Sequence, residues 1–295
     1  MDSPLVAAIE AGGTKFVCAV GTGPEDIEEA RFPTTLPEET IARSIEFFNE
    51  AQERRGNVES IGIGTFGPAD VDPKSPTFGH IKKTPKANWS GTDLASPISE
   101  SLSNVPLAFE TDVNAAAWGE RKWGAAEGLN DLIYITVGTG IGGGAVSDGK
   151  IVHGTSHPEM GHLRVPRDKS IDPFDGCCPF HGDCLEGLAS GTALKERWSE
   201  DPAKIPADHP AWELESSYLA DAIINITLTL SPERFVLGGG VMEQDHLFPM
   251  IRERVTERLA GYIEVPDPEK FIVPPGLGPQ AGVLGSLALA QDMLK

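Results

Sequence analysis

Positive charge is scarce in this sequence: 24 lysine and arginine residues stand against 44 aspartate and glutamate residues, for a net charge of −20. A surface this acidic repels nucleic acid and anionic lipid, so we expect neither as a partner. Long apolar runs are also missing, since no segment approaches the roughly 20 apolar residues that cross a bilayer. The opening Met-Asp-Ser-Pro has neither a basic nor an apolar region, so we expect no secretory signal and a cytoplasmic location.

Cysteine is rare as well, and three of the four cysteines, Cys177, Cys178 and Cys184, crowd around His181. A disulfide framework is not expected in a long chain without an export signal. Clustered Cys and His residues are instead typical of metal ligands. The spacing Cys178-x2-His181-x2-Cys184 resembles half of a structural zinc site, which needs four N or S ligands. His162 is the first candidate for the fourth ligand and Cys177 the second; inert buried cysteines and a catalytic Cys–His pair are the alternatives.

Strand-like and helix-like patterns alternate along the chain, which indicates the α/β class. A strand, a glycine turn and a second strand occur twice, at residues 4–20 and 132–147, so we interpret the chain as two related halves. Further strands are expected at 60–66, 105–110, 234–237 and 271–273. Helices are expected at 37–55, 113–123, 218–230, 248–262 and 281–294. Irregular segments are expected at 70–92, 165–184 and 200–213.

The two glycine turns have the composition of a phosphate-binding hairpin, because glycine lets backbone N–H groups approach phosphate oxygens and threonine adds a hydroxyl. Their residues are Gly12, Gly13, Thr14, Lys15, Gly138, Thr139 and Gly140. The second turn formally matches a dinucleotide fingerprint, but a strand follows it where that fingerprint requires a helix. No Walker A loop is present. The alternative for either turn alone is a structural role, and Glu10 beside the first turn is either a Mg²⁺-water ligand or an ordinary strand-end acid.

The strand expected at 105–110 runs directly into Thr111 and Asp112, at the strand end where open α/β sheets bind ligands. A carboxylate there can accept the proton of a hydroxyl that attacks phosphorus. A helix N-cap is the alternative for Asp112, and Asn114 is either a sugar contact or a cap. Glu159 and Glu186 flank the Cys/His group, where carboxylates could bind vicinal sugar hydroxyls or be ordinary surface residues.

Taken together, these segments resemble the ROK family of sugar kinases over nearly the whole chain. The matching segments are Ile9-Glu-Ala-Gly-Gly-Thr-Lys15, Glu110-Thr-Asp-Val-Asn114, Gly138-Thr-Gly-Ile-Gly-Gly-Gly144, Glu159-Met-Gly-His162 and Val236-Leu-Gly-Gly-Gly-Val241. The chain departs from the family in having Glu10 where Asp is usual and in its Cys-Cys-Pro-Phe-His-Gly-Asp-Cys loop. These departures resemble the bacterial fructokinase branch and favour His181 in place of the usual third cysteine.

The resemblance implies the two-domain sugar kinase/hsp70/actin-like ATPase fold, of the ribonuclease H-like type, with an interdomain cleft. The first domain is expected to span residues 1–114 together with a C-terminal helix at about 281–295. The second is expected to span 115–280 and to carry the zinc loop. A homodimer is also implied.

For the chemistry, the resemblance implies a kinase that uses ATP with Mg²⁺ to convert a hexose, in the first place fructose, to its 6-phosphate. Asp112 is the implied base, and Gly239 and Gly240 lie under the nucleotide. The implied sugar contacts are Gly67, Asn88, Asn114, Glu159, His162 and Glu186. The implied structural zinc ligands are His162, Cys178, His181 and Cys184.

Three alternatives keep parts of this interpretation. The substrate could be mannose, glucose or an N-acetylated amino sugar. A sugar-sensing regulator of the same fold usually carries an N-terminal helix-turn-helix, for which a first strand that begins by about residue 5 leaves no room. A zinc-organised interaction module would not need paired phosphate hairpins.

Overall fold

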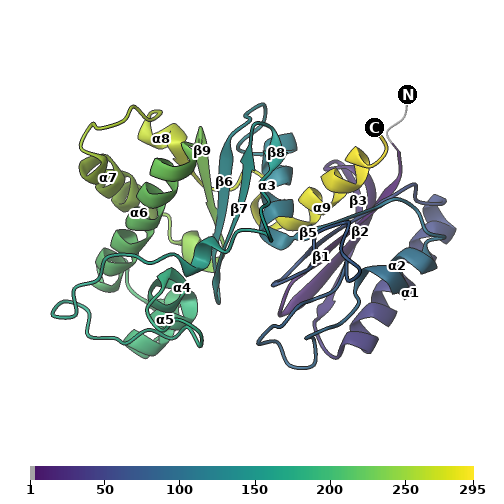
Figure 1. Ribbon diagram of the computed structural model, residues 1–295, viewed down its shortest axis with the longest axis horizontal. Helices are drawn as coiled ribbons and strands as arrows, with labels where there is room; N and C mark the ends of the chain where they lie inside the picture. Colours follow the sequence, from purple (N-terminus) through teal and green to yellow (C-terminus); the bar gives the residue numbers. More distant parts are fainter. Residues whose placement is uncertain (1–3) are drawn as a thin grey trace. The chain divides into compact units, whose positions relative to one another are not determined.

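A computed structural model describes residues 4–295 and divides the chain into two compact units (Figure 1). Of the described residues, unit 1 contains 4–127, the short segment 153–157 and 279–295. Unit 2 contains residues 128–152 and 158–278. Each unit is built around one five-stranded sheet.

Within the described residues, none of the helices combines the length and the apolar character needed to cross a membrane.

The two sheets have the same topology. In unit 1 the strand order is β3-β2-β1-β4-β5, and in unit 2, counted from the corresponding edge, it is β8-β7-β6-β9-β10. Each begins with antiparallel pairing between its first three strands and continues with two strands parallel to the first. The two related halves predicted from the repeated strand–glycine–strand pattern are therefore confirmed.

The strands of unit 1 are β1 (Val6–Ala11), β2 (Lys15–Gly23), β3 (Asp26–Pro33), β4 (Ile61–Thr65) and β5 (Leu107–Thr111). Its helices are α1 (Pro37–Arg55), α2 (Ala95–Ser101), α3 (Asp112–Trp123) and α9 (Ala281–Asp292), preceded by the 3-10 turn η4 (Gly278–Gln280).

The strands of unit 2 are β6 (Leu132–Val137), β7 (Ile141–Ser147), β8 (Lys150–Ile151), β9 (Arg234–Gly238) and β10 (Ile272–Val273). Its α-helices are α4 (Leu185–Ala189), α5 (Gly191–Trp198), α6 (Ala211–Leu230), α7 (Leu247–Leu259) and α8 (Pro268–Phe271). Its 3-10 turns are η1 (Met160–His162), η2 (Pro202–Lys204) and η3 (Gly240–Glu243).

The alternation of isoleucine and glycine in β4 explains how helices cover both faces of the first sheet. Alternate side chains of a strand point to opposite faces. Ile61 and Ile63 are fully buried in a core that includes residues of α1 and α2. Gly62 and Gly64 face the other way, where α9 and α3 lie so close that a Cβ on Gly62 would overlap the backbone of Ser286. Small residues on that face therefore permit the helices to touch the sheet.

Helix α3 packs along α9, and both helices belong to unit 1 (Figure 1). Gly119 and Gly285 meet in this contact, and a Cβ on Gly285 would overlap the carbonyl oxygen of Ala115. The sequence places the end of the first domain at about residue 114. The structure instead keeps the whole of α3 in unit 1, because this small-residue contact binds it to α9.

Several element boundaries differ from those expected from the sequence. Strand β3 is absent from the expectations, since its acidic residues give no apolar alternation. Strand β7 begins at Ile141, so the second glycine turn is shorter than the predicted turn 138–144. Helix α6 begins at Ala211, where irregular structure is expected up to residue 213. The short helices α4 and α5 follow the Cys/His segment without a long apolar repeat to mark them.

The α3–α9 contact gives a stability prediction for Gly285→Ala. Alanine is the better helix former by about 1 kcal/mol, yet the overlap with Ala115 should force the helices apart and lower the free energy of unfolding by about 1–3 kcal/mol. Gly23→Ala is the control, because a Cβ there meets nothing within 4 Å. Urea denaturation measures both variants, and a Gly285→Ala protein as stable as the wild type would contradict this view of the contact.

Candidate active site and metal centre

The first glycine turn joins β1 to β2 in unit 1. The Gly12 N–H donates to the Lys15 carbonyl at 2.9 Å, which closes the turn. Thr34, which directly follows β3, stabilises the turn, because its hydroxyl donates to the Gly12 carbonyl at 2.6 Å. A Cβ added to Gly13 would meet nothing within 4 Å, and Thr14 and Lys15 are exposed. The turn therefore presents a hydroxyl, an ammonium group and open backbone to solvent.

Glu10 lies one residue before β1 ends and points at the start of α9. A Cβ on Gly282 would lie 2.6 Å from its carboxyl carbon, and the Val283 N–H donates to the carboxylate. Burial raises the pKa of Glu10, although Lys15 opposes that effect. Its Oε2 has no hydrogen-bond partner among residues 4–295. A mostly buried carboxylate oxygen without a partner, beside a phosphate-type turn, suits a water molecule of a hydrated cation.

Asp112 is the first residue of α3, but it is not the N-cap. Thr111 occupies that position, and its Oγ1 accepts the Asn114 N–H at 3.2 Å. The carboxylate of Asp112 is half-buried and accepts its neighbour's N–H, that of Val113, at 2.9 Å. The capping alternative for Asp112 is therefore taken by Thr111, and an acidic group stands at the carboxyl end of β5, where ligands bind in sheets of this kind.

Asn114 is 1% exposed and its side chain is engaged within the protein. Its Nδ2 donates to Oε2 of the buried Glu110 at 3.0 Å. The other carboxylate oxygen of Glu110 lies 2.8 Å from Nε2 of His153. The bond from Asn114 to Glu110 connects the end of β5 to the first turn of α3. It differs from both functions expected for Asn114 from the sequence, which were a helix cap and a sugar contact.

The other unit 1 candidates lie on the loops after β4. The Gly67 carbonyl accepts the Thr84 hydroxyl at 3.2 Å, and a Cβ on Gly67 would lie 3.5 Å from the ring of His157. Asn88 is exposed and has a positive φ of 68°. The next residue, Trp89, is fully buried and donates its indole N–H to the Thr35 carbonyl at 2.9 Å. Trp89 thus anchors the loop that presents Asn88.

The second glycine turn joins β6 to β7 in unit 2. The Gly138 N–H donates to the Gly140 carbonyl at 2.9 Å, and Thr139 is exposed, as Thr14 is in the first turn. Glu186 braces this turn, because its Oε2 accepts the Ile141 N–H at 3.0 Å. A Cβ on Gly140 would lie 2.5 Å from the same oxygen. The carboxylate proposed to bind sugar is therefore packed against the turn proposed to bind phosphate.

The remaining unit 2 candidates lie before the turn η1 and after the strand β9. Glu159 is exposed, and its carbonyl accepts the His162 N–H at 3.0 Å within the short turn η1. Gly239, with φ of 93°, follows β9 so closely that a Cβ would lie 2.5 Å from the Val137 carbonyl oxygen. Gly240 is exposed and a Cβ there would meet nothing within 4 Å. The turn after β9 is thus open on one side, as a surface under a flat ligand must be.

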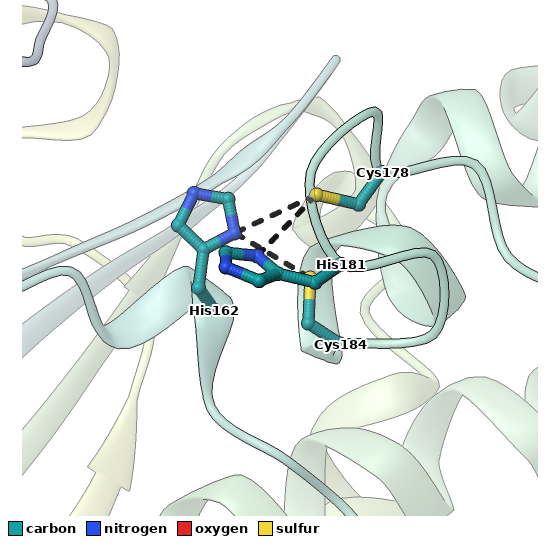
Figure 2. A group of neighbouring side chains, drawn as sticks. All are labelled: His162, Cys178, His181 and Cys184. Atoms are coloured by element: carbon teal, nitrogen blue, oxygen red, sulfur yellow. Dashed lines mark hydrogen bonds between the residues drawn. The ribbon is translucent and has the colours of Figure 1, made fainter.

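His162, Cys178, His181 and Cys184 converge on one point (Figure 2). Their ligand atoms all lie within 4.8 Å of one another. His162 Nδ1 is 3.4 Å from the Cys184 sulfur and 3.8 Å from that of Cys178, which in turn is 3.7 Å from His181 Nδ1. A tetrahedron of N and S ligands at zinc distances has edges of roughly 3.5 Å. The four side chains could therefore hold one tetrahedral metal ion.

Cys177 lies outside this group, with its sulfur 3.9 Å from the Ser190 hydroxyl. It is therefore not needed as the fourth ligand. Burial raises the pKa of Cys184 to about 11, so a thiolate there requires a bound cation to offset its charge. Arg164 and Arg167 both pair with Asp183, which stiffens the loop between His181 and Cys184.

His153 and His157 are not among the site residues expected from the sequence. Both belong to unit 1, and both contact its loops or strand ends: His153 pairs with Glu110, and His157 Nε2 accepts the Ala69 N–H at 3.2 Å. A signal was available, because three of the seven histidines, including His162, fall within ten residues. Their partners lie more than 40 residues away in sequence and could not be deduced from the pattern.

Paired sheets of identical order, each opening on a glycine turn, together with an acidic residue where β5 becomes α3, define the sugar kinase/hsp70/actin-like ATPase fold. The predicted fold class is confirmed. Within that class the chain belongs to the ROK family, whose profile matches residues 6–293.

Individual relatives agree with this assignment. The chain is 44% identical to the fructokinase of Zymomonas mobilis, over 98% of this chain and 97% of that protein. It is also 44% identical to the fructokinase of Pediococcus pentosaceus, over 99% of both. Among solved structures it is similar to a ROK family glucokinase from Streptomyces griseus in complex with glucose and AMPPNP, at 26% identity and a TM-score of 0.77, over 98% of this chain and 99% of that one.

Proposed function

We propose that this chain is an ATP-dependent hexose kinase that converts fructose to fructose 6-phosphate. The observation that carries the proposal is the end-to-end identity of 44% with two fructokinases. The chemistry of the described residues supports it, because phosphoryl transfer needs phosphate-binding turns, a base for the attacking hydroxyl and a site for a hydrated metal ion.

Asp112 is the proposed general base. Thr111 caps α3, so the Asp112 carboxylate is not required to satisfy the helix terminus. Its Oδ1 accepts the Val113 N–H at 2.9 Å, which holds the carboxylate at the start of the helix. The group would orient the sugar hydroxyl and accept its proton as the oxygen attacks the terminal phosphorus of ATP.

The two glycine turns are the proposed phosphate-binding elements, with Thr14, Lys15 and Thr139 exposed on them. Lys15 supplies a local cation on a chain whose net charge is −20. Mg²⁺ bound with ATP would neutralise phosphate charge, and Glu10 is the residue that would hold its hydration water. Gly239 and Gly240 form the proposed surface under the adenosine.

For the sugar, Glu159, His162 and Glu186 of unit 2 are the proposed contacts, together with Gly67 and Asn88 of unit 1. A carboxylate accepts hydrogen bonds from two neighbouring hydroxyls, which suits a hexose. Asn114 is the weakest of the candidates, because its amide is buried and bonded to Glu110. We further propose that the metal in the Cys/His group is a structural zinc ion and that the protein is a homodimer.

The substrate is tested by a coupled ADP-release assay with fructose, mannose, glucose and N-acetylglucosamine. We expect the highest kcat/KM for fructose. A site built to hydrogen-bond particular hydroxyls discriminates strongly against sugars that misplace them, by about 10²-fold or more. A protein that prefers one of the other three sugars would keep the kinase proposal and overturn fructose. A protein that transfers phosphate to none of them would overturn both.

The base is tested by Asp112→Asn, which should lower kcat by about 10²–10⁴-fold without unfolding the protein, because Thr111 still caps α3. Asp93→Asn is the matched control in the same unit. Asp93 caps a backbone N–H, that of Ser96 at 3.0 Å, and asparagine caps as well as aspartate. Steady-state kinetics and circular dichroism compare the two variants. Turnover by Asp112→Asn within threefold of the control would defeat the assignment.

The metal is tested by elemental analysis of purified protein, which should contain about one zinc ion per chain. Cys184→Ser should lose the ion and unfold at lower temperature, because three ligands bind zinc weakly and the loop loses its support. Cys177→Ser should retain it, since Cys177 lies outside the group. Active wild-type protein without metal, or equal zinc loss in both variants, would rule the site out.

A further inference from the structure

Residues His153–His157 form a short excursion of the chain that belongs to unit 1, although the residues on either side of it belong to unit 2. Both ends of the excursion are histidines bound to unit 1. His157 is buried and accepts the Ala69 N–H at 3.2 Å. His153 is partly exposed, and its Nε2 lies 2.8 Å from Glu110 Oε1. The excursion therefore places the imidazole of His153 within hydrogen-bond distance of the Glu110 carboxylate, near the end of β5.

Glu110 connects His153 to the first turn of α3. Its second oxygen accepts the Asn114 amide at 3.0 Å, while the Asn114 backbone N–H is bonded to the Thr111 hydroxyl. The two bonds close a loop around residues 111–113, which include Asp112. Glu110 and Asn114 are 8% and 1% exposed, so the bond between them is shielded from water and salt.

We propose that His153 is a positioning residue for phosphoryl transfer, because through Glu110 and Asn114 it fixes the turn that carries Asp112. This role rests on the proposed function of Asp112 as the base. His153 itself is not placed in contact with either substrate. A base must stand within hydrogen-bond reach of the proton it accepts, and a misplacement of about 1 Å can cost up to 10²-fold in rate.

The surroundings of His153 make Glu110 its dominant partner. Both residues line a cavity of about 500 Å³ in unit 1, and the other charged groups there are Asp70, Asp72, Lys74 and Lys82. Asp70 accepts the hydroxyls of Ser75 and Thr77 and lies 3.6 Å from Lys82. The remaining two charges, on Asp72 and Lys74, have opposite signs. The buried carboxylate of Glu110 is thus the one anion bonded to His153 among the described residues.

The His153–Glu110 bond should make turnover depend on pH. The hydrogen bond that His153 donates to Glu110 raises the pKa of His153 above its ordinary value of 6.5, against the effect of burial. A raised pKa means that the charged pair is complete below the ordinary value and is lost as pH rises through the raised one. The positioning effect should therefore be greatest at acidic pH and weaken toward alkaline pH.

The test measures kcat and both KM values from pH 6 to pH 9 for wild type, His153→Ala and His153→Gln. Loss of the pair should lower kcat of His153→Ala about tenfold at pH 6 with KM for ATP unchanged, and the gap should narrow as pH rises. His153→Gln keeps an N–H donor and most of the volume, so it should recover part of kcat but show no narrowing. It also guards against a variant that fails to fold.

Two further variants separate positioning from general damage. Glu110→Gln removes the charge while its amide oxygen can still accept from Asn114. Its kcat should therefore follow the pH profile of His153→Ala, with a gap to wild type that narrows as pH rises. Combined with His153→Ala it should add little, because both act through one contact. His80→Gln is the matched control: it alters another histidine of unit 1 that faces a carboxylate, Asp93 at 4.0 Å, and should leave the profile unchanged.

The outcomes distinguish this role from the proposed function. Parallel pH profiles for wild type and His153→Ala, or equal kcat at all pH values, in a protein that phosphorylates fructose would overturn the positioning role alone. A wild-type protein that transfers phosphate to no hexose would overturn the function and the role together.

Discussion

The close contact between α3 and α9 is the constraint on which the arrangement of unit 1 depends. Gly285 and Ala115 bring the two helix backbones together. On β4, the Gly64 N–H donates to the Ser286 hydroxyl at 3.1 Å, which ties α9 to the sheet as well. The first turn of α9 also receives the carboxylate of Glu10. The C-terminal helix α9 therefore contacts both Glu10, beside the first glycine turn, and the helix that begins with Asp112.

In unit 2, the carboxylate of Glu186 connects the segment after the Cys/His group to β7. Glu186 follows Cys184, the last cysteine of the Cys/His group, by two residues, and its carboxylate accepts the N–H of Ile141, the first residue of β7. The turn η1, which ends with His162, packs against β7 so tightly that a Cβ on Gly161 would overlap the Ile141 carbonyl oxygen. A metal ion at the four ligands would accordingly stabilise the residues proposed to bind sugar and the turn proposed to bind phosphate, without contacting either substrate.

Residue patterns predicted the two related halves, the α/β class and the four metal-ligand candidates, because each depends on spacing or on alternation along the chain. The two-domain kinase fold was expected from the resemblance to the ROK family. The patterns did not predict the edge strand β3, because its charged residues give no apolar alternation, or the start of α6 at Ala211. They left Asp112 undecided between base and cap, since Thr111 is an equally good cap and only geometry separates them. The contacts of Asn114 and His153 with Glu110 could not be predicted, because His153 lies more than 40 residues away from Glu110 in the sequence.

A crystal structure with fructose and a non-hydrolysable ATP analogue would test the central claim, that Asp112 takes the proton of the attacking hydroxyl. The account predicts the 6-hydroxyl of fructose within about 3 Å of the Asp112 carboxylate, with the hydroxyl oxygen facing the terminal phosphorus. A complex in which fructose is bound but its 6-hydroxyl points away from Asp112, or another group occupies the base position, would contradict it.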